Sequence, residues 1–340
     1  MVVTITGGTG FIGSRLAARE LERGNRVRVL GQVATEAERS NASRLAALGA
    51  QVTLGSVTDP PRVQAAVAGT DIVYHLAAAQ HEAGVPDRHF WDVNLGGTRN
   101  VVTACLAAGV RRLVHASTIG VWAGNDGDLL DEDTPPNPDN IYGRTKLAGE
   151  RAVLAAADRM PVVVVRISET YGPGDRRLLR LARAVARRRF MLIGDGSNRH
   201  HPIYIDDLVD GLLLAAATEA AVGGVFVLAG PDILTTREMV AIIGRQLGAP
   251  PTLGSIPLPP VLAAARLVEA VARPLGIRPP LHRRRVAFFV KSYAFSPQRA
   301  KDVLGFVPQT GFERGMAETL AWYREHGHLR SRRPAPDATR

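Results

Sequence analysis

The stretch Val2-Val3-Thr4-Ile5-Thr6-Gly7-Gly8-Thr9-Gly10-Phe11-Ile12-Gly13 combines a strand signal with a phosphate-binding signal. Every residue from 2 to 6 is β-branched, which is typical of a buried strand. Glycines at 7, 10 and 13 allow a tight turn, a close approach of backbone to a pyrophosphate, and close packing of the next helix on the strand. Because free N–H groups at a helix N-terminus attract anions, the stretch predicts a dinucleotide site.

Short apolar runs bounded by turn residues follow this motif, with helical patterns between most of them. The predicted strands are residues 27–30, 52–54, 71–76, 113–117 and 162–167. This alternation predicts an α/β fold, a doubly wound parallel sheet of the Rossmann type.

The pattern changes after residue 170, where glycine- and proline-rich turns begin. We therefore expect a dinucleotide-binding domain over residues 1–170, joined by one returning strand near 224–228. A smaller C-terminal substrate lobe is expected over 171–328. Few apolar residues follow it, so residues 329–340 are predicted to be a disordered tail.

Composition limits the classes of partner and compartment. The formal net charge is +10, but the arginines are mostly scattered and no nucleic-acid-binding motif accompanies them, so no nucleic-acid partner is expected. An acidic ligand or an anionic membrane surface stays open as a partner. The single cysteine, Cys105, excludes an internal disulfide and a cysteine-based zinc site, and no metal site is predicted. Prolines and charges interrupt the most apolar stretch, 256–271, so stable membrane insertion is not expected and the predicted localisation is cytoplasmic.

Tyr142 and Lys146 lie four residues apart on a predicted helix, so both side chains project from one face. A phenol has an ordinary pKa near 10 and is a poor proton carrier at neutral pH. A nearby ammonium group favours the phenolate and lowers that pKa. A surface Tyr–Lys pair is the plain alternative. Together with the glycine motif and the hydroxyls of Ser117 and Thr118, the spacing predicts a catalytic centre.

Five further segments occur in a defined order along the chain. They are His75-Leu76-Ala77-Ala78, Asn94-Leu-Gly-Gly-Thr-Arg-Asn100, Ala116-Ser117-Thr118, Tyr142-Gly-Arg-Thr-Lys146 and Arg166-Ile-Ser-Glu-Thr-Tyr-Gly-Pro-Gly174. With the glycine motif, they make residues 1 to about 325 resemble the extended short-chain dehydrogenase/reductase superfamily, and within it the NAD-dependent epimerase/dehydratase family.

The resemblance implies a role for each matched residue. Thr118 would hydrogen-bond the substrate oxygen, Ser117 would support the strand end or the cofactor ribose, and Asn94 would either steady the cofactor helix or cap it. His75 and Cys105 are expected to be buried structural residues. The implied catalytic residues are Thr118, Tyr142 and Lys146. The implied cofactor-binding residues are Gly7, Gly10, Phe11, Ile12, Gly13, Leu76, Ala77, Ala78, Asn94, Ser117, Tyr142, Lys146 and Ser168.

The choice between NAD and NADP is left undecided by the sequence. Enzymes that use NAD usually carry an acid at the end of the second strand to hold the ribose 2′-hydroxyl, and here Gly31 occupies that position. Ser56 stands where relatives often have an aspartate for the adenine. Arg39 and Arg44 follow within reach of a 2′-phosphate, which favours NADP slightly, but both fit solvated helix charges equally well.

The substrate side departs from nucleotide-sugar epimerases at three places. Glu169, His200 and Lys291 stand at or near positions where those enzymes tend to carry asparagine or diphosphate-binding arginines. The segment 256–260, with an apolar helix expected to about residue 272, instead resembles the 3β-hydroxysteroid dehydrogenase and dihydroflavonol-reductase-like group.

We therefore predict an NAD(P)-dependent oxidoreductase that transfers a hydride between nicotinamide and a secondary alcohol or ketone. The expected small-molecule substrate is apolar: steroid-like, flavonoid-like or a hydroxy acid. The alternative is an NAD-retaining nucleotide-sugar epimerase or dehydratase. A non-catalytic cofactor-binding protein is a third hypothesis, against which the Thr118–Tyr142–Lys146 set argues.

A homodimer is also expected. The resemblance implies pairing through two helices of each subunit, here over residues 94–108 and 142–157. The second helix is rich in alanine, so a partner helix could approach closely.

Overall fold

The computed structural model describes residues 1–80, 85–125, 129–249, 254–261, 263, 264, 268 and 291–329. Most of the expected tail and most of the apolar helix expected up to residue 272 lie outside the described residues. Contacts within the chain define two units. The first consists of Met1–Thr170, His201–Pro231 and Tyr293–Gln309; the second consists of Tyr171–His200, Asp232–Ser292 and Thr310–Arg340.

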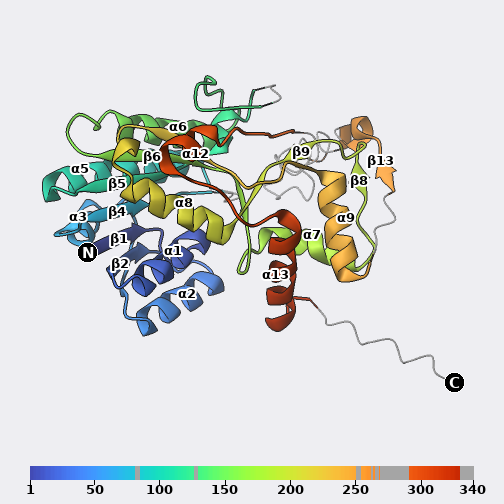
Figure 1. Ribbon diagram of the computed structural model, residues 1–340, viewed down its shortest axis with the longest axis horizontal. Coiled ribbons are helices and arrows are strands. Elements are labelled where there is room, and N and C mark those ends of the chain that lie inside the picture. Colours follow the sequence, from blue (N-terminus) through green and yellow to red (C-terminus); the bar gives the residue numbers. More distant parts are fainter. Residues whose placement is uncertain are drawn as a thin grey trace. The chain divides into compact units, whose positions relative to one another are not determined.

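The first unit contains a seven-stranded parallel sheet with the strand order β11-β6-β5-β4-β1-β2-β3 (Figure 1). Its strands are β1 (Val2–Thr6), β2 (Arg26–Gly31), β3 (Gln51–Leu54), β4 (Ile72–His75), β5 (Arg112–Thr118), β6 (Val162–Ile167) and β11 (Val225–Leu228). Neighbouring β1 and β4 form the switch point of the strand order, where ligands of such sheets bind. The predicted doubly wound α/β fold is confirmed, including the return of the strand near 224–228.

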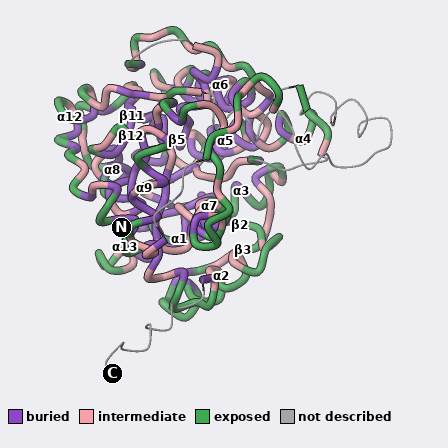
Figure 2. The backbone as a smooth tube through the Cα atoms, turned by 90° about the vertical axis from the view of Figure 1, so that its right-hand side faces the viewer, coloured by how far each residue is buried: buried purple, intermediate pink, exposed green. Residues whose placement is uncertain are grey.

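Helices cover both faces of this sheet. One apolar cluster joins alternate strand residues to α1 (Phe11–Glu22) and α8 (Ile205–Ala217), and a second joins the other strand residues to α3 (Pro60–Val67), α5 (Thr98–Ala108) and α6 (Ile141–Leu154). Val163 and Val165 lie in the first cluster, whereas Val162 and Val164 lie in the second. Because β6 is buried on both faces, it is a continuous apolar run broken only by Arg166. Figure 2 shows the contrast between these buried strands and the mostly exposed α2 (Glu36–Ala47).

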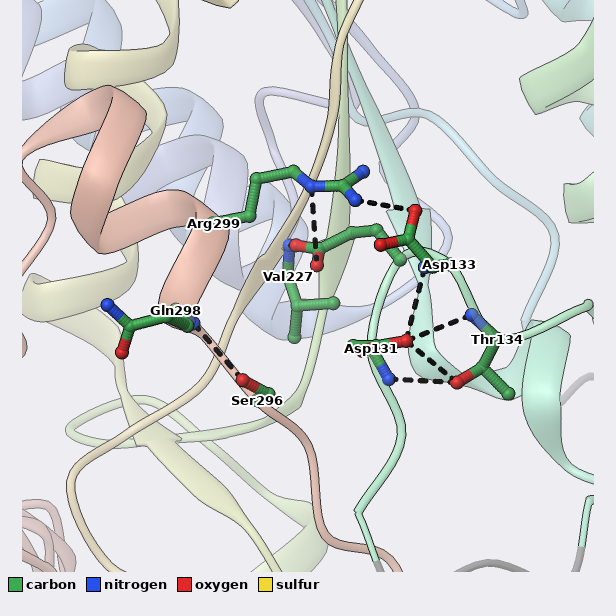
Figure 3. Close-up of polar contacts among 8 residues, drawn as sticks. Asp131, Asp133, Thr134, Val227, Ser296, Gln298 and Arg299 are labelled. Atoms are coloured by element: carbon green, nitrogen blue, oxygen red, sulfur yellow. Dashed lines mark hydrogen bonds and ion pairs between the residues drawn. The ribbon is translucent and has the colours of Figure 1, made fainter.

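Two segments of the first unit were expected in the C-terminal lobe. The helix α8 packs on β5 and β6, and α12 (Gln298–Leu304) packs on β11. The loop before α6 is also tied to α12 and to β11: Arg299 of α12 donates to Asp133 at 2.7 Å, and Glu132 accepts from Val227 N of β11 at 2.6 Å (Figure 3). The glycine- and proline-rich turns after residue 170 indicate where the chain leaves the sheet. They do not indicate which later helices pack on the first unit again.

The helix expected over residues 94–108 begins earlier. The structure has α4 (Asp87–Trp91), a π-helix (Asp92–Gly97) and then α5, in one continuous run. Pro86 precedes α4 and Asp87 lies in its first turn, both of which are favourable helix starts. Asn94 therefore lies inside a helical segment, and the N-cap interpretation of this residue is wrong.

The second unit is built around α7 (Arg177–Ala186), α9 (Thr236–Leu247) and α13 (Phe312–Glu325). Its short strand pairs are β9 (Arg199–His200) with β12 (Leu234–Thr235) and β8 (Leu192–Ile193) with β13 (Ser255–Ile256). The buried Tyr323 hydroxyl donates to the carbonyl of Asp175 at 2.6 Å and ties α13 to the segment before α7. Within both units, no helix in the described part of the chain is long and apolar enough to span a membrane.

Candidate active site

The helix α6 carries Tyr142 and Lys146 one turn apart at its start. Asn140 caps this helix by accepting a hydrogen bond from Gly143 N at 3.0 Å, which defines where the first turn begins. Tyr142 is half-buried and Lys146 is buried, with 2% of its surface exposed. Tyr142 therefore keeps part of its surface exposed, whereas the Lys146 amine is buried against the sheet.

Lys146 Nζ donates to the carbonyl of Ala116 in β5 at 2.6 Å. Burial lowers the pKa of Lys146 to about 8, and the negative charge of Glu150 partly opposes that shift. Removal from water disfavours the ammonium form, while a nearby carboxylate favours it. The amine is thus positioned at the end of β5 with a pKa close to neutral pH.

Thr118 ends β5 and lies beside Tyr142. Its Oγ1 accepts a hydrogen bond from Gly120 N at 3.0 Å, so the hydroxyl proton is available for donation. A Cβ atom built on Gly120 would lie 3.3 Å from Oγ1 of Thr118 and 3.7 Å from Cδ1 of Tyr142. The two side chains therefore converge on this glycine, and the structure brings the three predicted catalytic residues together.

The glycine motif forms a cradle against the loop after β4. Gly7 has φ +70°, and a Cβ atom there would lie 2.7 Å from the backbone nitrogen of Ala77. A Cβ atom on Gly13 would strike the carbonyl oxygen of Gly7. A side chain at either glycine would collide with protein backbone, so both glycines permit the tight turn and the close helix packing that a pyrophosphate-binding motif requires. The first N–H groups of α1, at Phe11 and Ile12, face this end because a helix start leaves them without intrahelical partners.

Asn94 links the loop after β4 to α6. Its Oδ1 accepts from Ala79 N at 2.8 Å, and its Nδ2 donates to the carbonyl of Ala79 and to Oγ1 of Thr145, the latter at 2.9 Å. Thr145 immediately precedes Lys146. The π-helix turns this amide inward, in keeping with the frequent occurrence of π-turns at functional sites.

His75 is a fully buried residue with both ring nitrogens hydrogen-bonded. Nδ1 pairs with Thr6 Oγ1 at 2.7 Å and Nε2 with Thr98 Oγ1 at 2.9 Å. Burial, and to a smaller extent Lys146, lowers the pKa of His75 to about 3, so the ring is neutral. The expectation of a structural histidine agrees with these contacts. The free Cys105 is likewise buried, and burial raises its pKa to about 12.

Two expected cofactor residues use their hydroxyls elsewhere. Ser117 Oγ donates to Glu150 at 2.8 Å, and Ser168 Oγ donates to the carbonyl of His201. Each hydroxyl has its proton committed within the protein. Any cofactor contact by these residues would have to use the oxygen lone pairs.

Sequence reasoning missed a buried ion pair beside Lys146. Arg166 of β6 and Glu150 of α6 are both nearly fully buried; the pair is bidentate, with Arg166 Nε donating to Glu150 Oε2 at 3.2 Å. The guanidinium also lies 4.4 Å over the ring of Trp122. Two signals pointed to it: Glu150 lies four residues after Lys146, and an arginine within an apolar strand requires a partner.

Ser56, which the sequence predicts to lie near the adenine, lines an open pocket of about 590 Å³. It is lined by Gln32, Ser56, Thr58, Arg88, His89, Asp92, Val93, Gly96 and Asn100. A Cβ atom at Gly31 would lie 2.5 Å from Thr9 Oγ1, so Thr9 occupies the space of an acidic side chain at the end of β2. Arg39, one candidate for a 2′-phosphate, forms a 3.2 Å ion pair with Glu36.

A sequence profile of the NAD-dependent epimerase/dehydratase family matches residues 3–229. The chain belongs to this family. The predicted membership is confirmed, and the chain is an NAD(P)-dependent oxidoreductase of the extended short-chain dehydrogenase/reductase type.

Curated relatives cover most of the chain. A 2-alkyl-3-oxoalkanoate reductase of Stenotrophomonas maltophilia is 32% identical over 334 residues, which cover 94% of this chain and 99% of the relative. A decarboxylating sterol-4-alpha-carboxylate 3-dehydrogenase of Saccharomyces cerevisiae is 32% identical over a stretch that covers 80% of this chain and 82% of the relative. The crystal structure of gox2253 superposes with a TM-score of 0.79 at 27% identity, covering 96% of this chain and 99% of that one.

Proposed function

We propose that this oxidoreductase acts on an apolar secondary alcohol or ketone at a centre formed by Thr118, Tyr142 and Lys146. This centre is assigned from one observation: Thr118 and Tyr142 both lie close to Gly120, and the buried Lys146 amine bonds to the same strand at Ala116. The assignment of the substrate is supported by the relatives, whose names specify an alkyl oxoalkanoate and a sterol carboxylate.

The three side chains have complementary tasks in this proposal. The nicotinamide, when bound, supplies or accepts the hydride. Tyr142 moves the proton to or from the substrate oxygen, and Thr118 donates a hydrogen bond to the same oxygen. Lys146 favours the phenolate by its charge and would also hold the ribose hydroxyls. Because the pKa of Lys146 is about 8, this charge is largely present at pH 7.

The cradle at Gly7, Gly10 and Gly13 would hold the pyrophosphate, with the N–H groups of Phe11 and Ile12 directed at it. Leu76, Ala77 and Ala78 would pass beneath the cofactor, where small side chains allow close approach. Asn94 would position both this loop and Lys146 through its bonds to Ala79 and Thr145. NAD and NADP both stay open as the cofactor.

Two carboxylates close to Tyr293 support an apolar substrate over a nucleotide sugar. Burial raises the pKa of Tyr293 well above its ordinary value, and the nearby Asp139 and Glu169 carboxylates raise it further. These carboxylates belong to the same unit as Tyr142. A diphosphate placed between them would be repelled.

The test is a substrate screen with purified protein. Apolar ketones and alcohols, hydroxy acids and nucleotide sugars are each added with NAD(H) or NADP(H), and absorbance of the reduced nicotinamide is followed. Stoichiometric consumption of cofactor with an apolar ketone or alcohol is the expected result. Tightly bound NAD that is not consumed, with turnover of a nucleotide sugar, would replace this proposal with the epimerase alternative.

A homodimer through α5 and α6 is also part of the proposal. The face of α6 opposite its buried residues carries Arg144, Arg151 and Ala155 in exposed positions, with Ala148 and Ala152 half-buried. The small side chains allow close approach of a second helix. Light scattering at low micromolar concentration should give a dimer mass, and a clean monomer mass would contradict it.

We further propose a cytoplasmic location. The buried, unpaired Cys105 suits a reducing compartment, and so does dependence on the nicotinamide pool. Cell fractionation with an antibody to the chain should recover it in the cytoplasmic fraction, and recovery outside the cell would contradict this.

A further inference from the structure

The helix α7 and the turn after it form a strongly basic surface among the described residues of the second unit. Seven arginines lie between residues 176 and 189, all of them exposed, and no acidic residue occurs between Asp175 and Asp195. In the described part of the chain, the only ion pair made by this set joins Arg177 to Asp175 at 3.1 Å. Six exposed guanidinium groups are thus left without a carboxylate partner there.

These arginines are gathered on one side of the helix. Arg176, Arg180, Arg183 and Arg187 follow each other at intervals of four, three and four residues, which places them in a single stripe along the helix. Leu179, Ala182 and Val185 face the other way and are buried, in a helix that packs against α9 (Figure 1). We call the four arginines the α7 stripe.

Apolar and aromatic groups border the α7 stripe. Directly after the run Arg187-Arg188-Arg189, Met191 has 49% of its surface exposed. At another edge, Arg183 Nε donates to the carbonyl of His328 at 3.0 Å, which brings the end of α13 against the stripe. There the half-buried Trp322 stacks on the exposed His326 with ring centroids 4.1 Å apart.

We propose that the α7 stripe docks this protein on an anionic phospholipid surface. The apolar face of α7 is buried within the protein, so the attraction comes from its charge: a cluster of basic residues binds anionic lipid headgroups, and each arginine near such a surface strengthens binding about fivefold. Tryptophan at the border is also typical of a membrane–water interface. The inference does not depend on the proposed reaction, although a lipid surface is where an apolar substrate would dissolve.

The side chains that surround the arginines favour lipid over nucleic acid as the partner. A nucleic-acid surface of this size would use aromatic rings to stack on bases or a recognition helix with polar residues reaching base edges. The exposed face of α7 offers arginine and alanine alone, and the exposed side chain at its end is the aliphatic Met191. The ring of Trp322 at the border is already stacked on His326.

The experiment is vesicle flotation with the full chain. Vesicles of phosphatidylcholine alone are compared with vesicles that contain about one third phosphatidylglycerol, at salt rising from about 50 to about 300 mM. We expect binding to the anionic vesicles only, weakening as salt rises. Equal binding to both kinds of vesicle, or binding to neither, would overturn the proposal.

Two triple variants separate the stripe from overall charge. Arg176→Gln/Arg180→Gln/Arg187→Gln removes three stripe charges and should weaken binding roughly 100-fold. The matched control, Arg26→Gln/Arg111→Gln/Arg159→Gln, removes three exposed charges from the first unit and should bind like the wild type. Equal loss in both variants would mean that net charge, not the stripe, causes binding. Circular dichroism melts of both variants show that each is folded.

A nucleic-acid competitor provides the remaining comparison. Double-stranded DNA at equal phosphate concentration should displace little protein from anionic vesicles, and Met191→Ser should lower the binding that survives at high salt. If DNA binds the wild type more tightly than the vesicles do, and the stripe variant loses that binding, the surface is a nucleic-acid site and the lipid proposal is wrong.

Discussion

The Nζ atom of Lys146 donates a hydrogen bond to the carbonyl of Ala116 at 2.6 Å and so joins α6 to the end of β5. Ser117, the next residue, donates to Glu150 one helical turn further along α6. The residue after that, Thr118, lies close to Gly120, as does the ring of Tyr142. Residues 116 and 117 thus bond to neighbouring turns of α6, and residue 118 lies near the Tyr142 ring at the start of that helix. These contacts determine the geometry of the candidate centre.

The buried amine of Lys146 should reduce stability at neutral pH. Its pKa is about 8 in the folded protein against an ordinary 10.5, so between these values the unfolded chain binds more protons and stability rises with pH. Below pH 8 the cost of burying the charge is fully present, roughly 3 kcal/mol. Allowing about 1 kcal/mol for the lost hydrogen bond, Lys146→Met should gain about 2 kcal/mol in free energy of unfolding at pH 7.

Denaturant titrations of the wild type and Lys146→Met at pH 7 and about pH 10 check this. The advantage of the variant should shrink as pH rises, because the wild-type amine then becomes neutral. The variant should also lose turnover and bind cofactor more weakly. A variant that is less stable than the wild type at both pH values would show that the buried charge is compensated in the fold.

Tyr142→Phe removes the phenolic hydroxyl and keeps the ring. We expect kcat to fall by about 10²–10⁴, the usual contribution of a positioned proton carrier, with the cofactor dissociation constant nearly unchanged. Steady-state kinetics and cofactor titration by fluorescence measure the two effects. Retention of most of the activity would remove Tyr142 from the proton-transfer role.

Thr118 offers a matched pair of substitutions. Thr118→Ser keeps the hydroxyl that accepts from Gly120 N, whereas Thr118→Val keeps the shape and removes it. We expect the serine variant to keep most of kcat and the valine variant to lose roughly 10- to 100-fold, about the value of one lost hydrogen bond to a developing charge. Equal activity of the two variants would show that Thr118 only caps the strand.

Removal of one partner from the buried ion pair of Arg166 and Glu150 should destabilise the fold strongly, because the other charge would stay buried without compensation. Glu150→Ala leaves the guanidinium buried and uncompensated, so we expect a loss of about 3–5 kcal/mol in free energy of unfolding. The double variant Glu150→Met/Arg166→Met should recover much of that loss. As a control, Glu36→Ala breaks the exposed pair with Arg39 and should change stability by less than about 0.5 kcal/mol. A double variant no more stable than Glu150→Ala would contradict this account.

The sheet was predictable from sequence because each strand is a short apolar run between turn residues, and β6 has the predicted bounds, 162–167. Catalytic candidates were predictable because Tyr142 and Lys146 occur at helical spacing beside a glycine motif. The π-helix at Asn94 was not predictable from sequence, because no local residue type specifies a widened turn. The side-chain amide of Asn94 is held by Ala79 and by Thr145, which lies 51 positions away. The pairing of Arg166 with Glu150 depends on the packing of α6 against β6, which neither segment reveals alone.

The last prediction concerns the choice of cofactor. Gly31 carries no acid, and Thr9 Oγ1 would lie 2.5 Å from any Cβ atom placed there, so Gly31→Asp alone should clash and destabilise the loop. Thr9 also donates to the carbonyl of Gln32 at 2.7 Å, which holds the end of β2 in its present position. The double variant Thr9→Gly/Gly31→Asp makes room for a carboxylate beside the ribose 2′-hydroxyl and should favour NAD. We expect the wild type to bind NADP(H) slightly more tightly than NAD(H). The double variant should bind NAD(H) about tenfold more tightly than NADP(H), because a carboxylate repels the 2′-phosphate.

Dissociation constants for both cofactors are measured by fluorescence titration of the wild type, Thr9→Gly and the double variant. Comparison with Thr9→Gly separates the effect of the new charge from that of the change at Thr9. A wild type that clearly prefers NAD would show that Gly31 and the arginines after it do not select for the 2′-phosphate.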